Sequence, residues 1–461
     1  MNTCVVSDRK KNITVKAERM AIYMQSTIVE ASADNRQSYY LIFYKNDFLI
    51  AIKAASVNRR SFLEKAFKKG MRFSGNHPLM ENLLSSSPVY MVKSLPSFME
   101  KLPSRYSSYE AAYIFTFFDA FLTKKHIFKE IQSIYFQYRR NGQLFGSYRM
   151  IQLLKQYVPK HSWLKQLMAD ASFDRFSELY TQQPSLLLTD DPLYAERMMF
   201  KKRSDGDNAS ALQQIYSKEN RIVELMALLI TEMKRRPSMK VYREITERLP
   251  VYFSDTQRLK IFENLYKQSP QFSALQEDLI HSYLNGDHPE KAVSLMTSAR
   301  TSLTAEQLEK IAVSLKHSQF DKDKHILSHA NKVIIQLFDA HPEHAEDLLK
   351  KCIISMLQHY DFKYIFDWMA PIQKASPNSP IFAQVMKMEG LANDPEKQLQ
   401  LGELYYAFKQ FDLAIECFSW EMELKSSDPK PVLWLSKAYY EKGMEQESKA
   451  YREMYRTMQQ A

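Results

Sequence analysis

The 461-residue chain is poor in glycine. Only 9 residues are glycine, about 2% of the chain where roughly 7% is usual. Loops that press the backbone against a phosphate need closely spaced glycines followed by defined polar residues. The nearest pair, Gly70 and Gly75, is followed by Asn76 and His77 instead of Lys and Ser or Thr. Phosphate-loop and dinucleotide-fingerprint enzymes are therefore disfavoured.

Cysteines and long apolar runs are also scarce. The three cysteines, Cys4, Cys352 and Cys417, lie far apart, whereas a secreted disulfide framework has an even set in a short chain. The N-terminal residues contain no apolar stretch of about 7 to 15 residues that would form a signal peptide. The densest apolar run, residues 113–122, has about half of the ~20 residues that a bilayer crossing needs and contains Asp119. We expect a cytoplasmic protein without a transmembrane segment.

Acidic residues are under-represented in the N-terminal third. Residues 1–150 carry 23 Lys and Arg against 11 Asp and Glu, whereas residues 251–461 carry 24 against 29. The formal net charge of +10 therefore comes from the N-terminal part. Such an asymmetry can indicate a surface for nucleic acid, anionic lipid or an acidic protein. The alternative is a solvated basic face that keeps the protein in solution.

The first hundred residues contain the strand signals. Residues 39–44 and 48–52 are β-branched and aromatic runs, and the polar residues 45–47 between them predict a hairpin. Residues 21–29 and 89–92 can add strands, while residues 59–69 alternate apolar and basic positions with a helical period. We therefore predict a small basic α/β module over residues 1–105.

From residue 107 onward the sequence is typical of helices. A hydroxyl residue precedes Glu or Gln by three positions at Ser107, Ser254 and Thr304, which is the spacing of a capping box. A helix over residues 126–140 is expected to stop at Asn141-Gly142. The polar residues 203–208 form the predicted break. The fold class is thus mainly α, with a helical connecting region over residues 106–203 and a helical-repeat domain over residues 204–461.

A self-similarity of 34 residues appears near the C-terminus. Leu401-Gly402-x-x-Tyr405 recurs as Leu435-Ser436-x-x-Tyr439, and Asp394-Pro395 recurs as Asp428-Pro429. With Ala414 and Phe418, this order resembles the tetratricopeptide repeat, a helix-turn-helix unit. A weaker copy begins at Leu279-Ile280-x-x-Tyr283 and continues at Ala292 and Met296. Because 122 residues separate its start from that of the copy at Leu401, the resemblance implies an irregular helical solenoid.

The resemblance also implies a concave face lined by the first helix of each unit, where peptides or partner helices bind. On this sequence that face would present Glu403, Tyr406, Lys437 and Tyr440. Family members that hold chaperone tails carry a Lys and Asn pair there, and this chain has Leu399 with Glu403 and Leu433 with Lys437. Chaperone-tail binding is disfavoured. The alternative is that the four side chains are ordinary polar surface.

No residue set predicts catalysis, a cofactor or a metal. Five histidines lie within 28 residues, at positions 317, 325, 329, 341 and 344. Although His325 and His329 are one helical turn apart, the Glu of a metalloprotease helix is absent, and we expect a solvated helix face. Asp119 is either a buried acid with a raised pKa or a surface residue. The 23 methionines are expected to fill gaps in helical cores.

The leading hypothesis is a non-enzymatic scaffold or adaptor that binds a partner peptide or helix in a helical-repeat groove. The alternative is a nucleic-acid-associated regulator that contacts phosphates through its basic N-terminal module. A third possibility is an enzyme with a site between the α/β module and the helices. The sequence indicates neither the partner nor the oligomeric state.

Overall fold

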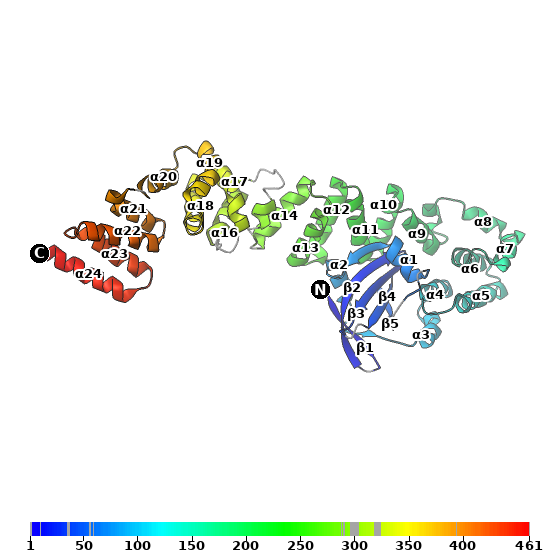
Figure 1. The fold of residues 1–461 in the computed structure, drawn as a ribbon. Helices are drawn as coiled ribbons and strands as arrows, with labels where there is room; N and C mark the ends of the chain where they lie inside the picture. The colour runs from blue at the N-terminus through cyan, green and yellow to red at the C-terminus, as the bar shows by residue number, and fades with distance from the viewer. Residues whose placement is uncertain are drawn as a thin grey trace. The chain divides into compact units, whose positions relative to one another are not determined.

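The computed structural model describes residues 2–9, 11–34, 37–54, 57–58, 60–286, 288, 291–295, 304–317, 324–392 and 394–460, without the side chains of 314, 316–317, 324–326 and 328–329. The fold is mainly α and begins with a small β-sheet module, as the sequence predicts (Figure 1). The chain divides into two compact units, Met1–Ser269 and Pro270–Ala461.

The first unit begins with a seven-stranded sheet. Its strands are β1 (Thr3–Asp8), β2 (Lys11–Tyr23), β3 (Ser26–Ser32), β4 (Ser38–Tyr44), β5 (Asp47–Lys53), β6 (Met71–Ser74) and β7 (Tyr90–Met91). Both predicted strands of the hairpin, β4 and β5, are confirmed. Its turn has two residues instead of three, because Tyr44 pairs directly with Asp47 and only Lys45 and Asn46, both with positive φ, lie between them. That geometry is the one that matches the twist of paired strands.

The sheet curves into a near-barrel. Its order is β5-β4-β3-β2-β1-β7, and β7 runs parallel to β1. A parallel bridge from Ala51 in β5 to Val92 brings the two ends of this order together. The long strand β2 pairs with β1 through its first half and with β6 through its second half, on either side of a bulge between Ala17 and Arg19. A bulge bends a strand and so supports this change of partner.

Strand β4 is buried on both faces, which explains its unbroken apolar sequence. Phe43 contacts the rings of Phe48 and Tyr90 across the sheet. Tyr44 contacts the rings of Tyr113 and Phe117, which belong to the helical region. Helices cover one face of β4 and residues of the sheet cover the other. The strand therefore has no solvent-exposed face, and its sequence does not alternate between apolar and polar residues.

Helices complete the first unit. The helical pattern of residues 59–69 is confirmed from Phe62 onward as α1, and the helix predicted over residues 126–140 is confirmed as α5, which begins at Lys124. Gly142 has the predicted left-handed conformation with φ of +70°. The three predicted capping boxes are present, at Ser107, at Ser254 and, in the second unit, at Thr304. The helices are α1 (Phe62–Lys69), α2 (Pro78–Leu84), α3 (Leu95–Lys101), α4 (Ser108–Phe115), α5 (Lys124–Arg140), α6 (Leu144–Tyr157), α7 (Ser162–Met168), α8 (Asp174–Leu179), α9 (Pro192–Lys201), α10 (Gly206–Lys218), α11 (Ile222–Arg235), α12 (Met239–Tyr252) and α13 (Asp255–Tyr266).

The predicted ranges 1–105, 106–203 and 204–461 do not coincide with the two compact units. The hairpin turn after β2 is held by the helices, since the Gln25 amide donates to the Leu193 carbonyl oxygen at 3.1 Å. The predicted break at residues 203–208 is short, because α10 begins at Gly206, and the Arg203 guanidinium donates to the carbonyl oxygen of Lys69 at 2.7 Å. Long-range contacts of this kind join the sheet module to helices up to residue 269.

The second unit consists of helices that pack on their neighbours in sequence, as expected for an irregular helical solenoid. Its core is a chain of buried residues from Val293 to Cys417 and a smaller cluster around Phe418. None of the helices in the described part of the protein combines the length and apolarity that a bilayer crossing requires. The helices are α14 (Ser273–Asn285), α16 (Ala305–His317), α17 (Lys324–Ala340), α18 (Pro342–Met356), α19 (Phe362–Ala375), α20 (Pro380–Ala392), α21 (Gln398–Ala407), α22 (Phe411–Leu424), α23 (Pro429–Glu441) and α24 (Glu445–Gln460).

Candidate functional site

The two copies of the 34-residue pattern form equivalent helix hairpins. In α21–α22 the backbone N–H of Gln410 donates to the carbonyl oxygen of Tyr405 at 2.9 Å, and in α23–α24 that of Met444 donates to Tyr439 at 3.0 Å. The residue before each donor, Lys409 or Gly443, has a positive φ. This is a Schellman turn, which ends a helix by satisfying its last carbonyl groups. Tyr405 and Tyr439 therefore occupy equivalent places.

The small residues of the pattern lie where the two helices of each hairpin cross. A Cβ added to Gly402 would lie 2.5 Å from Cε1 of Phe418, so only glycine fits at this crossing. In the second hairpin Ser436 replaces the glycine, and its hydroxyl donates to the Ser448 carbonyl oxygen at 2.9 Å. The Ser448 hydroxyl donates back to the Ser436 carbonyl oxygen at 2.8 Å. The helices of the first hairpin thus approach each other because Gly402 has no side chain, and those of the second are joined at the equivalent position by the hydrogen bonds of Ser436.

The same turn recurs earlier in the chain, once at the helix end predicted at Asn141-Gly142 and once at Asn220, which was not predicted. The N–H of Gln143 donates to the carbonyl oxygen of Tyr138 at 2.9 Å, and that of Arg221 to Tyr216 at 2.8 Å. Gly142 and Asn220 supply the positive φ. In both cases the sequence has a Tyr four residues before a Gly or Asn at the end of a helical pattern. This spacing alone is a weak indication of a repeat when the Gly, Ser and Ala positions of the 34-residue pattern are missing.

The weaker copy at residues 279–296 is described only in part. The His288 N–H donates to the Tyr283 carbonyl oxygen at 2.9 Å, which is the bond found in the other turns. Leu279, Ile280 and Ala292 are buried, as packing positions of a repeat would be. Met296 lies outside the described residues.

The four predicted groove residues lie on α21 and α23, but they are not alike. Glu403 and Lys437 are exposed, and Tyr440 is 62% exposed. Tyr406 is half-buried, because its ring meets that of Trp434 with centroids 5.1 Å apart. The Lys437 ammonium lies 4.4 Å from the same Trp434 ring, a cation–π distance. Trp434, which the groove prediction left out, therefore brings Tyr406 and Lys437 together.

The histidine cluster forms no metal site among the described residues. His341 has its Nε2 3.2 Å from the carbonyl oxygen of Ala305, and His344 lies 4.0 Å from the Glu309 carboxylate. His317, His325 and His329 lie on described helices, but their side chains fall outside the described set.

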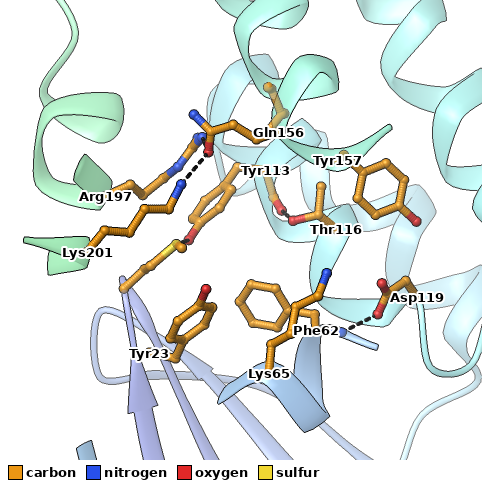
Figure 2. Close-up of a pocket in the computed structure, with 12 residues that line it drawn as sticks. Tyr23, Phe62, Lys65, Tyr113, Thr116, Asp119, Gln156, Tyr157, Arg197 and Lys201 are labelled. Atoms are coloured by element: carbon orange, nitrogen blue, oxygen red, sulfur yellow. Dashed lines mark hydrogen bonds between the residues drawn. The ribbon is translucent and has the colours of Figure 1, made fainter. Parts of the chain in front are cut away.

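The first unit contains a cavity of about 110 Å³ (Figure 2). It lies where the turn after β2 and the N-terminal part of α1 meet α4, α6 and α9. Aromatic rings form much of its wall, with polar groups around them. Its lining residues are Tyr23, Met24, Phe62, Lys65, Tyr113, Thr116, Asp119, Leu153, Gln156, Tyr157, Arg197 and Lys201.

Arg197, which lines this cavity, is buried and has no acidic partner. Its side chain is 1% exposed, and among the described residues no carboxylate lies within 4.0 Å of its guanidinium. The guanidinium lies over the ring of Tyr113 at 4.7 Å and donates from Nη2 to Oε1 of Gln156 at 2.6 Å. Its Nε and Nη1 atoms find no acceptor in the part of the chain that the structure describes. A buried charge without a counter-ion costs several kcal/mol.

Arg221 shows how this protein treats a buried arginine elsewhere. It is 2% exposed and pairs with Glu196 at 2.8 Å and with Glu224 at 3.1 Å. A buried arginine in this protein can therefore be paired with carboxylates, as Arg221 is. The missing counter-ion is specific to Arg197 in the cavity wall.

Lys201 adds a second positive charge to the same side of the cavity. It follows Arg197 by one helical turn on α9, and its ammonium donates to the same Gln156 oxygen at 3.3 Å (Figure 2). Although the residue reaches the surface, loss of water around the ammonium and, to a smaller extent, the charges of Arg197 and Lys69 together lower the pKa of Lys201 to about 8. Lys65 contributes a third cation from α1.

The one carboxylate in the cavity wall, Asp119, lies across the cavity from Arg197 and Lys201 (Figure 2). It is 7% exposed and accepts a hydrogen bond from the backbone N–H of Phe62 at 2.6 Å. Burial raises the pKa of Asp119, while the Phe62 hydrogen bond opposes the rise. Of the two alternatives left by the sequence, the buried acid is confirmed. Its contact with the first turn of α1 gives it a structural role.

No protein-family model matches the chain, and no curated protein matches its sequence.

Sequence reasoning missed Arg197 and Lys201 as site residues. The signal was present in part, since Arg197 falls on the buried face of α9 with Leu193 and Phe200. A charge at a core position of an amphipathic helix indicates a buried ionisable group. The cavity itself could not be predicted, because Arg197 is far in sequence from Tyr23, Phe62 and Tyr113.

Proposed function

We propose that this protein is a non-enzymatic scaffold whose helical-repeat unit binds a partner polypeptide on the face formed by α21 and α23. The observation that supports the proposal is the pair of equivalent hairpins, Tyr405–Gln410 and Tyr439–Met444, with exposed side chains on the first helix of each. Stacked hairpins of this type form extended binding faces. The resemblance to tetratricopeptide repeats is part of the proposal.

The chemistry of this face suits a peptide or helix with both an apolar and a charged side chain. Tyr440 offers a largely exposed ring, and aromatic residues are enriched where proteins bind each other. Lys437 and Glu403 offer charges of opposite sign for orientation. Trp434 holds the Lys437 side chain in place through its ring.

The test compares two double variants of the full-length chain in a quantitative pull-down from its source cells. Lys437→Glu with Tyr440→Ala alters the proposed face on α23. Lys449→Glu with Met454→Ala changes the same kinds of side chain on α24, where both are also exposed. We expect a specific polypeptide to be recovered with the unmodified chain and the α24 variant, and recovery to fall about tenfold with the α23 variant, since losing a key contact costs roughly 1–2 kcal/mol. Equal recovery by both variants would contradict the proposal.

A second candidate, a nucleic-acid-associated regulator, is favoured by the excess of 23 basic over 11 acidic residues within residues 1–150. Binding of the full chain to RNA or DNA that weakens steeply with added salt would support it, because phosphate contacts release counterions. Binding that does not depend on salt, or no binding at low salt, would count against it.

A further inference from the structure

The cavity of the first unit has a strong excess of positive charge. Arg197, Lys201 and Lys65 contribute three cations to its wall, and Asp119 contributes the one carboxylate there. Figure 2 shows Arg197 and Lys201 converging on Gln156, with Asp119 on the far side. Gln156 is a neutral acceptor that both cations share at 2.6 Å and 3.3 Å, so it satisfies donors without balancing charge.

Arg197 makes the cavity more than a cluster of surface charges. It is almost fully buried, and two of its nitrogen atoms have no acceptor in the described protein. A buried donor that stays without an acceptor destabilises the folded protein, and more so when the group is charged. An anion in the cavity would supply the missing negative charge beside this guanidinium.

We propose that this cavity binds the phosphate group of a small phosphomonoester, with Arg197 and Lys201 as its principal ligands. Such a group carries a charge of about −1.5 to −2 at neutral pH and presents three acceptor oxygens. Arginine and lysine are the side chains that proteins use for this purpose, arginine through directional hydrogen bonds and lysine as a point charge. The site lies in the first unit and is separate from the α21–α23 face.

The size of the cavity favours a small ligand. Its volume is about 110 Å³, and an engineered cavity of about 150 Å³ holds one benzene molecule. The cavity of the first unit is smaller than that, so it has room for the phosphate group itself, and an organic part as large as a phenyl ring would extend out of it on the side where Lys201 reaches the surface. The rings of Tyr23, Phe62 and Tyr113 offer an apolar wall to the organic part.

A phosphate is favoured over a carboxylate because two cations converge on one side of the cavity. A monoanion would balance either Arg197 or Lys201, while a dianion balances both. The lowered pKa of Lys201 is consistent with this arrangement, since it results from loss of water around the ammonium and, to a smaller extent, from the charges of Arg197 and Lys69.

Isothermal titration calorimetry of the full-length chain tests the proposal with three probes, inorganic phosphate, phenyl phosphate and benzoate. Two variants, Arg197→Met and Lys201→Met, remove the proposed ligands one at a time. Lys202→Met is the matched control, because it removes the same charge from the adjacent exposed residue, which does not line the cavity. Since Lys201 reaches the surface, its variant is expected to fold even if Arg197→Met does not.

We expect the unmodified chain to bind both phosphate probes more tightly than benzoate. Lys201→Met should weaken phosphate binding by about tenfold or more, because a charge-assisted hydrogen bond is worth roughly 1.5–3 kcal/mol. Lys202→Met should change the affinity by less than about twofold, as expected of an exposed charge outside the site. Arg197→Met should abolish the heat of binding while the circular dichroism spectrum stays unchanged.

Three results would overturn the proposal. The first is no phosphate binding at millimolar concentrations, which would mean that water satisfies Arg197. The second is an equal loss with Lys201→Met and Lys202→Met, which would indicate a general effect of surface charge. The third is equal affinity for phenyl phosphate and benzoate, which would remove the argument for a dianion. None of these results bears on the α21–α23 face, so the two proposals fail separately.

Discussion

At the scale of single residues, His77 shows how burial fixes a protonation state. It is 3% exposed, and its Nδ1 accepts the backbone N–H of Leu79 at 3.2 Å as the N-cap of α2. Burial and, to a smaller extent, the charge of Lys234 together lower the pKa of His77 to about 3. The folded protein therefore keeps this imidazole neutral under conditions in which an unfolded chain would protonate it.

We predict that His77 makes the protein sensitive to acid. Because the pKa is about 3 when folded and 6.5 in the reference state, the unfolded chain binds one more proton between these values. The stabilisation is complete above pH 6.5 and falls as the pH decreases, by about 1.4 kcal/mol per pH unit. His77→Asn keeps a good cap without a titrating group, so its free energy of unfolding should decline less steeply. Urea unfolding at several pH values between 7 and 5 measures both slopes, and equal slopes would contradict the prediction.

Several single-residue roles were predictable because they depend on neighbours in sequence. The capping boxes at Ser107 and Ser254 and the left-handed Gly142 follow from local hydrogen bonds and backbone sterics. Arg197 was not predictable as a site residue, because its role depends on Tyr113 and Gln156, which lie 84 and 41 positions away in the sequence.

At the scale of elements, the helix crossing inside each hairpin explains the spacing of the 34-residue pattern. Gly402 lets α21 approach the Phe418 ring of α22, and Phe418 is fully buried and stacks on Trp434 with centroids 5.7 Å apart. A fully buried ring that is packed on both sides cannot move aside without cost. Glycine is therefore required at this position because a side chain would clash with Phe418, and not because the backbone has a conformation that only glycine adopts.

We predict opposite effects for two Gly→Ala substitutions in helices of the second unit. Gly402→Ala would place a methyl group 2.5 Å from the Phe418 ring, and overpacking of this kind costs about 1–3 kcal/mol. Gly390→Ala is the control, because nothing lies within 4 Å of its added Cβ and it is exposed on α20. Alanine there should stabilise by about 0.5–1 kcal/mol. Urea unfolding measures both values, and a destabilisation of equal size in the two variants would show that the crossing is not tight.

Helices and strands were predicted correctly where their sequence pattern is local. The prediction was incomplete for strands that are defined by pairing with a distant strand. The hairpin β4–β5 has its own turn and apolar strands, and it was identified. Strands β1 and β6 were missed, since both are defined by pairing with β2 and β6 has only four residues. A run of 13 residues with a bulge, as in β2, gives no clean alternation over its whole length.

At the scale of the whole molecule, the boundary between compact units was not readable from composition. The predicted break at residues 203–208 is polar, yet Arg203 binds the backbone of Lys69. The boundary at Ser269–Pro270 lies between α13 and α14 in a short segment with no marked change in composition. Units are defined by which residues share a core, and that is a property of long-range contacts.

Each unit buries its own apolar residues, and this leads to a prediction for the unfolding of the full chain. Leu41 in β4 is fully buried in the first unit, and Leu349 in α18 is fully buried in the second. Replacing either by alanine removes the same atoms from a packed core and costs about 2–5 kcal/mol. We expect calorimetry of the full chain to show two unfolding transitions, because separate cores can melt at different temperatures.

Leu41→Ala should then lower one transition and Leu349→Ala the other, by about 2–4 °C for each kcal/mol lost in units of this size. The two variants serve as controls for each other, since the substitution is chemically identical. A single transition that both variants lower equally would mean that the chain unfolds as one cooperative body. In that case a ligand in the cavity of the first unit would also stabilise the α21–α22 and α23–α24 hairpins, because binding to the folded state stabilises everything that unfolds with it.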